Sequence, residues 1–192
     1  MLSRRAYHSR MFAGMIVALA AWSGFALRSK AEVGALTEYE IKVGLLYQFA
    51  VYTQWPKEAL PDGGSEFVLG IIGEDPFGNA LDFLRGKTVK SRKFTVKHVA
   101  NAQEIDRCHM LFICASEKTN VLQILTAVEK SSVLTISEVD QFIEQGGMIN
   151  FVLVKKTARS EYVRFEINKA AAEQAGLKLH SGFLKAANRL VQ

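Results

Sequence analysis

The chain has 192 residues, of which 49% are hydrophobic and 22% are charged, a composition typical of a globular protein. Its formal net charge of +5 comes entirely from five basic residues that precede the first acidic one, Glu32: Arg4, Arg5, Arg10, Arg28 and Lys30. Removing these five from the 24 basic residues leaves 19 against 19 acidic residues, so the rest of the chain is electrically balanced. Because a nucleic-acid surface needs a clustered excess of Lys and Arg, no nucleic-acid partner is expected.

The start of the chain has the pattern of a secretory signal peptide. A basic N-terminus is followed by an uncharged run at residues 11–27 and a small-residue cleavage signature at 29–31, with 33–35 as a second candidate. We therefore expect residues 1–31 to be a signal peptide and the protein to reach the periplasm. The apolar run is at the short limit for a bilayer core of roughly 30 Å, so an uncleaved inner-membrane anchor is the less favoured alternative.

The part of the chain after the leader begins with a predicted helix. Thr37 and Glu40 form a capping-box pair, and apolar residues recur at helical spacing up to Tyr52. The Trp-Pro pair that follows ends this helix, because a residue before proline avoids the α region. About 160 residues suit one domain with its own core, and we expect residues 37–192 to form it.

Beyond this helix, apolar segments of strand type and helix type alternate. The predicted strands span residues 67–72, 93–99, 109–114, 133–137, 148–154 and 162–167. The predicted helices span residues 79–84, 117–128, 139–144, 169–175 and 183–191. This alternation predicts a three-layer α/β fold: a mostly parallel sheet flanked by helices, with the last two strands as an antiparallel hairpin at the C-terminal edge.

The turn at residues 73–78 follows a buried strand, at the edge of the sheet where α/β folds bind ligands. It lacks the glycine spacing of a phosphate loop, and the carboxylates of Glu74 and Asp75 would repel a phosphate. One interpretation is local: Asp75 caps the following helix and Pro76 takes its first position. The alternative is that Glu74, Asp75, Pro76 and Phe77 contact a small ligand or a partner protein.

Three further residues are candidates for such a contact. Asn150 is polar within an apolar run, so it either pins a neighbouring loop by hydrogen bonds or lines a ligand or partner groove. Tyr52 and Trp55 close an aromatic-rich helix that is apolar around most of its circumference. A surface helix normally keeps one polar face, so this breadth indicates either a dimer or partner contact or deep burial within the monomer.

Nothing in the sequence indicates a catalytic or metal centre. His98, His109 and His180 stand apart from other ligand residues, which does not suit a metal site. Ser116 lacks the glycine-flanked elbow of a nucleophile and is explained as a helix cap. We therefore expect no enzymatic activity, no metal and no cofactor.

The two cysteines, Cys108 and Cys114, bracket a predicted strand about 20 Å long. A disulfide needs Cα atoms within about 7 Å, so none is expected between them. They are interpreted as two buried hydrophobes or, alternatively, as redox-sensing or intermolecular thiols.

Five separated blocks of the sequence are similar to those of one protein family. They are residues 38–56 (EYEIKVGLLYQFAVYTQWP), 67–81 (FVLGIIGEDPFGNAL), 108–117 (CHMLFICASE), 133–153 (VLTISEVDQFIEQGGMINFVL) and 163–187 (VRFEINKAAAEQAGLKLHSGFLKAA). In order and spacing they resemble the YfiR family of periplasmic regulators, across nearly all of the chain after the leader. The resemblance implies a compact α/β protein, often dimeric, with no agreed catalytic residues.

The resemblance also implies a function. The best-known family member holds an inner-membrane diguanylate cyclase inactive by binding its periplasmic sensor domain, and an outer-membrane-associated lipoprotein relieves this inhibition. Similar domains are sensor modules of signalling kinases. We therefore expect a non-enzymatic regulator that docks on and inhibits the sensor domain of a membrane-bound cyclase or kinase, most directly in cyclic di-GMP control. The alternative is a periplasmic small-molecule-binding protein with a crevice beside Glu74, Asp75 and Asn150.

One position departs from the family pattern. In relatives with structural disulfides, Cys108 resembles one partner, and its mate falls on the first strand near Gly70. Because position 70 is glycine here, the resemblance does not extend to redox control.

Overall fold

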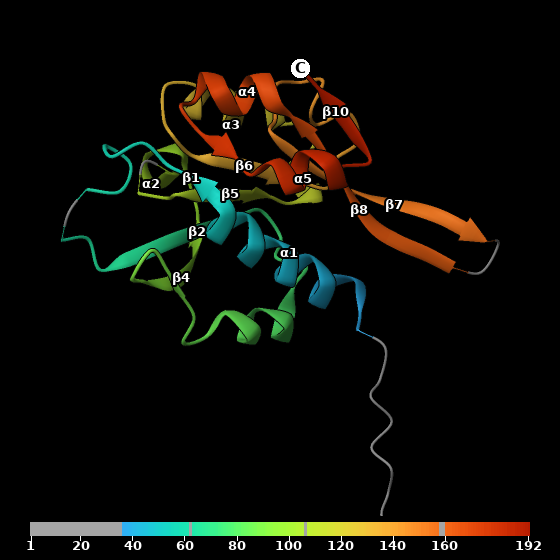
Figure 1. Ribbon diagram of the computed structural model, residues 1–192, viewed down its shortest axis with the longest axis horizontal. Helices are drawn as coiled ribbons and strands as arrows, with labels where there is room; N and C mark the ends of the chain where they lie inside the picture. The colour runs from blue at the N-terminus through green and yellow to red at the C-terminus, as the bar shows by residue number, and fades with distance from the viewer. Residues whose placement is uncertain (1–35, 62, 106, 158–159) are drawn as a thin grey trace, which may run out of the picture. The chain divides into compact units, whose positions relative to one another are not determined.

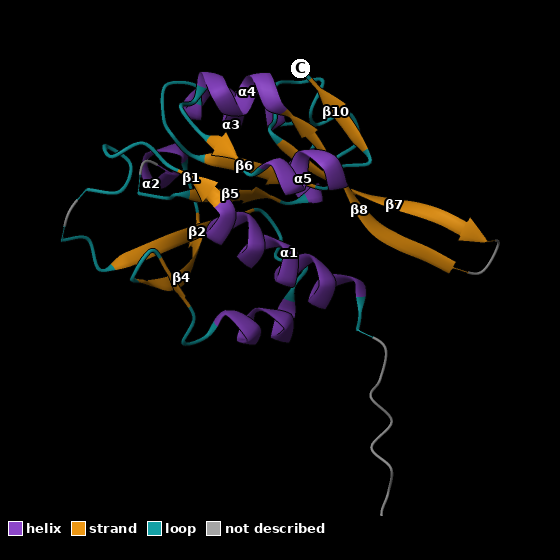
Figure 2. Cartoon of the chain, viewed as in Figure 1, coloured by secondary structure: helices purple, strands orange, loops and turns teal. Residues whose placement is uncertain are grey.

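The computed structural model describes residues 36–192 with the exception of residues 62, 106 and 158–159 (Figure 1). The expected signal peptide, residues 1–31, lies outside the described residues. The described part is a mixed α/β structure with an eight-stranded sheet and a separate two-stranded one (Figure 2). No helix in this part combines the length and apolar character needed to cross a membrane.

Helices and strands alternate along most of the chain. The strands are β1 (Thr53–Gln54), β2 (Glu66–Ile72), β3 (Thr88–Val89), β4 (Arg92–Val99), β5 (Met110–Ile113), β6 (Leu134–Ser137), β7 (Ile149–Thr157), β8 (Ser160–Asn168), β9 (Lys178–Leu179) and β10 (Arg189–Val191). The α-helices are α1 (Glu38–Tyr52), α2 (Ala102–Ile105), α3 (Val121–Val128), α4 (Lys169–Gln174) and α5 (Ser181–Ala186). Two 3-10 helices are η1 (Gly78–Leu84) and η2 (Ala115–Glu117).

The large sheet is mixed rather than mostly parallel. Its strands lie in the order β10-β8-β7-β6-β5-β2-β4-β3. Neighbours run parallel from β7 through β6, β5 and β2 to β4, whereas β7–β8 and β3–β4 are antiparallel. The expected hairpin is present, but β10 pairs in parallel with β8 and takes the edge of the sheet. The prediction was therefore wrong about the parallel character of the sheet and about the edge.

Two predicted helices are absent. Residues 139–144 form turns, in which Gln141 has a positive φ of 59°, a conformation foreign to a right-handed helix. Residues 183–191 divide into the end of α5 and strand β10. The Asn188 amide donates to the Phe165 carbonyl (2.7 Å) and leads the chain into pairing with β8. A short apolar run is compatible with either a helix or a strand. Here the edge of β8 favours a strand, because pairing with it satisfies backbone hydrogen bonds.

The central strands are buried on both faces. Leu69 and Ile71 of β2 belong to one apolar cluster together with residues of α1, whereas Val68 and Ile72 belong to a second cluster with residues of α3. Because alternate side chains of a strand point to opposite faces, the two clusters lie on opposite sides of the sheet. This burial explains why the run from 67 to 72 lacks polar alternation.

Helix α1 is anchored at its start and buried along much of its length. The Glu40 amide donates to the Thr37 hydroxyl (3.3 Å) and the Thr37 amide to the Glu40 carboxylate (2.7 Å), which confirms the predicted capping box. Val43, Leu46 and Phe49 are fully buried. Burial within the monomer therefore accounts for apolar residues of this helix that lie outside its main stripe.

The thiol of Cys108 lies against Gly70 of β2. A Cβ atom built on Gly70 would lie 2.6 Å from the Cys108 Sγ. In a disulfide these two atoms are roughly 3 Å apart. Position 70 thus lies where the resemblance places the mate of Cys108. Cys108 and Cys114 are both free thiols in this structure.

We expect Gly70→Cys to form a disulfide with Cys108 under oxidising conditions, because the two side chains would already be in contact. Thiol titration of the oxidised, denatured variant should then find only Cys114. Gly70→Ser, which adds similar bulk without sulfur, controls for crowding. An oxidised, folded Gly70→Cys protein that still shows all its thiols would contradict the geometry.

Candidate functional site

The loop at residues 73–78 is tied to the start of η2 at the carboxyl edge of the sheet. The Glu74 amide donates to the Ser116 hydroxyl (2.9 Å). Gly73 permits this approach, because its φ is +96° and a Cβ there would lie 2.4 Å from the Ser116 Oγ. Ser116 is therefore not the helix cap expected from the sequence. It lies within η2 and holds the neighbouring loop.

Asp75 has both a local and a distant partner. Its Oδ1 accepts from the Phe77 amide (2.8 Å), a cap of the turn that precedes η1. Its Oδ2 lies 2.9 Å from the His98 Nε2 on β4. Strands β2 and β4 are parallel neighbours, so the ends of both reach the same edge. The predicted helix cap was wrong in position, because η1 begins at Gly78 with Phe77 as its N-cap, so Asp75 stabilises the preceding turn instead. The contact with His98 depends on strand order and was missed.

The four candidates in this loop differ in accessibility. Glu74 is exposed, and Asp75 and Pro76 are half-buried. Phe77 is buried, and its ring packs edge-on against Tyr39 of α1 with centroids 5.6 Å apart. Phe77 therefore positions the loop from within the core, and only the other three can touch a ligand or a partner.

A buried ammonium group links α1 to the same edge. Lys42 is only 3% exposed and donates to the carboxylates of Glu38 and Glu138, the latter at 2.5 Å. Its Nζ also lies 4.7 Å from the centre of the Tyr39 ring. Glu138 directly follows β6, so this contact ties the first helix to the carboxyl end of a central strand.

These contacts shift the pKa of both side chains on α1. Burial lowers the pKa of Lys42, but its hydrogen bonds to Glu138 and Glu38 outweigh burial, so the pKa is raised overall. Burial raises the pKa of Tyr39, and the negative charge of Glu138 raises it further. The lysine is therefore charged and the phenol neutral at physiological pH.

The thiols of Cys108 and Cys114 have low reactivity. Burial raises the pKa of Cys108 to about 11. Burial, followed by the nearby carboxylate of Asp75, raises the pKa of Cys114 to about 12. A protonated, buried thiol is a poor nucleophile and redox sensor. In the described part of the chain, no three His, Cys, Asp or Glu side chains lie close enough together to hold a metal ion.

Asn150 of β7 does not join the carboxyl-edge cluster. Its neighbours Ile149 and Phe151 belong to the same apolar cluster as Phe77, so the alternation along β7 directs Asn150 to the opposite face. The side chain is buried, and no described group bonds its Oδ1. The crevice expected between Asn150 and the 73–78 loop is therefore not formed.

The two aromatic candidates lie in different surroundings. Tyr52 is 53% exposed and packs beside Phe183 of α5, with ring centroids 5.9 Å apart. Trp55 is half-buried: its ring packs edge-on against Phe67 at 5.1 Å, and its Nε1 donates to the His109 carbonyl at 3.4 Å. Tyr52 thus remains available to a partner, whereas Trp55 mainly stabilises the fold.

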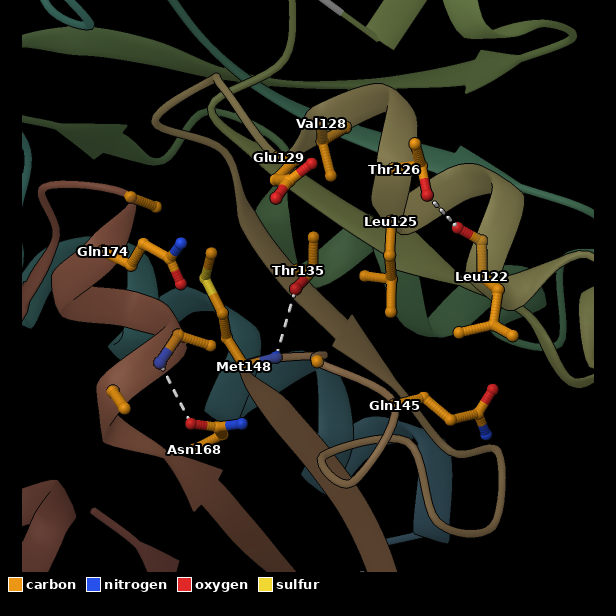
Figure 3. A pocket seen from close by; sticks show the side chains of 14 residues that line it. Leu122, Leu125, Thr126, Val128, Glu129, Thr135, Gln145, Met148, Asn168 and Gln174 are labelled. Carbon is orange, nitrogen blue, oxygen red and sulfur yellow. Dashed lines mark hydrogen bonds between the residues drawn. The ribbon is translucent and has the colours of Figure 1, made fainter.

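A pocket of about 400 Å³ lies between α3 and α4 (Figure 3). Leu125 of α3 and Met148 supply apolar walls, and Thr135 of β6 lies between the two helices. The Thr135 hydroxyl accepts from the Met148 amide (3.1 Å), and the side-chain Oδ1 of Asn168 accepts from the Ala171 amide (3.0 Å). Its volume is within the range of small-molecule sites. The sequence did not reveal this pocket, because α3 and α4 are far apart in the chain.

The hairpin of β7 and β8 extends beyond the rest of the sheet (Figure 1). Only Ile149 and Asn150 of β7 pair with β6, and β10 pairs only with the last three residues of β8. We call residues 151–157 and 160–165 the hairpin arm. It carries Leu153 (46% exposed) and Tyr162 (49% exposed). Leu153 pairs with Val163 and Tyr162 with Val154, so the two exposed side chains lie on opposite faces of the ribbon.

We expect Lys42→Ala to lower the free energy of unfolding by about 2–4 kcal/mol, because it leaves the Glu138 carboxylate largely buried without its cation. Lys42→Ala/Glu138→Gln should recover part of this loss.

Because the Lys42 pKa is raised on folding, the contribution of Lys42 to the free energy of unfolding is complete below the unfolded pKa of about 10.4. It disappears as the pH rises through the folded pKa. Lys118→Ala, at an exposed site, is the control for urea unfolding. Equal losses of unfolding free energy in Lys42→Ala and Lys118→Ala would contradict a stabilising role for Lys42.

Two solved structures are similar to this one in part. A conserved domain protein from Vibrio cholerae has a TM-score of 0.48 and 14% identity, over 82% of this chain and 61% of that one. The ABC domain in complex with L-Trp from Streptococcus pneumonia has a TM-score of 0.46 and 12% identity, over 65% of this chain and 55% of that one. The chain thus spans less than two thirds of either protein.

A search of curated proteins finds no match. A family model described as YfiR/HmsC-like matches residues 39–188, which include nearly all of the five sequence blocks noted above. The match extends from α1 to the residue before β10. This chain therefore belongs to the YfiR/HmsC-like family.

Proposed function

We propose that this protein is a periplasmic, non-enzymatic regulator that docks on the sensor domain of an inner-membrane signalling enzyme, in the first instance a diguanylate cyclase, and holds it inactive. The family match over residues 39–188 carries this proposal, because a family of periplasmic regulators fits a regulatory role. Export by a signal peptide at residues 1–31 is part of the proposal. Relief of the inhibition by an outer-membrane lipoprotein and the formation of a homodimer are also part of the proposal.

Two surfaces suit the docking role. The hairpin arm offers apolar contacts through Leu153 and Tyr162. The carboxyl edge offers charged and polar contacts through Glu74, Asp75 and Pro76. Apolar anchors supply most of the affinity of an interface, whereas exposed charges mainly set its specificity and rate of association.

Inhibition by docking needs only a difference in affinity. If the regulator binds the inactive arrangement of the sensor domain more tightly than the active one, bound enzyme shifts toward the inactive state. A preference of roughly 100-fold would hold an evenly balanced enzyme about 99% inactive. No chemical step by the regulator is required, which agrees with the protonated thiols of Cys108 and Cys114.

Deletion of the gene should raise cellular cyclic di-GMP, and complementation should restore it. We expect Leu153→Asp to fail in complementation and to weaken binding to the purified sensor domain roughly tenfold or more, because a charge replaces an apolar anchor. Leu122→Asp, at a leucine on α3 that is more exposed still (62%), is the control. Calorimetry with the sensor domain measures the affinity. Unchanged cyclic di-GMP after deletion would rule out control of a cyclase.

The pocket between α3 and α4 favours a second candidate function, the binding of a small molecule as a periplasmic binding protein or sensor module. A matching compound from pooled periplasmic metabolites should raise the melting temperature by several degrees. Ala171→Phe would fill the pocket and abolish this rise, whereas Ala186→Phe on α5 would not. A rise that survives Ala171→Phe, or no rise with any compound, would count against this function.

A further inference from the structure

A second cavity, of about 520 Å³, lies at the amino edge of the sheet and is rich in basic side chains. Arg92 is the first residue of β4, Arg107 and His109 lie just before β5, and Lys130 lies a few residues before β6. Because these strands are parallel, their amino ends meet at one edge and bring the four residues together. The cavity is at the opposite ends of the strands from the 73–78 loop.

Arg92 is the central group of this cavity. It is only 8% exposed, and its guanidinium donates to the Pro61 carbonyl. A Cβ on Gly64 would lie 1.8 Å from the Arg92 Nη1, so the chain passes directly over the guanidinium. No carboxylate of a described residue forms an ion pair with it. A buried cation without a counter-ion is costly, so the site favours an anion.

The other walls add to the positive charge. Arg107 and Lys130 are exposed at the cavity, and Glu58 is the one carboxylate among its described lining residues. Among the described lining residues, the cations Arg92, Arg107 and Lys130 outnumber this one carboxylate. His109 adds none at neutral pH, because burial, followed by the charge of Arg92, lowers its pKa. The hydroxyl of Ser132 supplies a further hydrogen-bond donor.

We propose that this cavity binds a small ligand that carries a phosphate-monoester dianion. The excess of cations among the described lining residues suits the negative charge of such a group. Guanidinium groups hold phosphate oxygens through paired N–H donors, and a lysine adds a point charge. The cavity is larger than a phosphate, which leaves room for the rest of the ligand. A soluble phosphate ester and a lipid headgroup with a terminal phosphate share this chemistry.

The test uses the purified chain with inorganic phosphate and glycerol 3-phosphate in calorimetric titrations. Both should bind, and Arg107→Gln/Lys130→Gln should weaken the binding roughly tenfold or more. These two positions are exposed, so the variant should fold normally. Arg85→Gln is the control, because it removes an exposed cation that pairs with the nearby Asp82 and is not among the described lining residues of this cavity.

A second arm of the test separates the two sources of phosphate. Vesicles of phosphatidylcholine with and without phosphatidic acid are compared by flotation. Binding of glycerol 3-phosphate without vesicle binding supports a soluble ester, and binding to phosphatidic acid vesicles alone supports a lipid headgroup. No binding to any probe, or binding that the double variant retains in full, would overturn the proposal.

Discussion

Burial of both faces of β2, β5 and β6 is the constraint on which the rest of the structure depends. The side chains of these strands alternate between two apolar clusters, and each cluster needs a cover. Helix α1 supplies one through Val43, Leu46 and Phe49, and α3 contributes to the other. Each such side chain contributes about 1.5–3 kcal/mol when it is removed from water. Once both faces are covered, the candidate sites lie at the ends of the strands, on the flanking hairpin and between the covering helices α3 and α4.

The two ends of the central strands differ in charge. The carboxyl edge carries Glu74, Asp75 and Glu138, with Lys42 buried among them. The amino edge carries the basic cavity around Arg92. Residues 32–192 have no formal net charge, yet the fold separates charges of opposite sign to opposite edges. Net charge therefore describes the whole chain and not the local charge at either edge.

The hairpin arm differs from the rest of the sheet because its strands pair only with each other. A two-stranded ribbon is marginally stable by itself, so a partner that covers Leu153 on one face or Tyr162 on the other would stabilise the arm and gain affinity at once. The pocket between α3 and α4 lies on more rigid elements and suits a small ligand. The proposed docking surface and the proposed ligand pocket thus lie on different parts of the fold.

Local features of this protein were determined by the sequence alone: the capping box of Thr37, the buried run at 67–72 and the five blocks that identify the family. The structural features depend on residues a few positions apart, and the family assignment depends on similar sequence blocks that occur in the same order. The tertiary structure decided the mixed sheet, the edge strand β10, the contact of Lys42 with Glu138 and the basic cavity. These depend on which distant strands become neighbours. Periodicity reports which face of an element is apolar, but it does not specify the element that covers it.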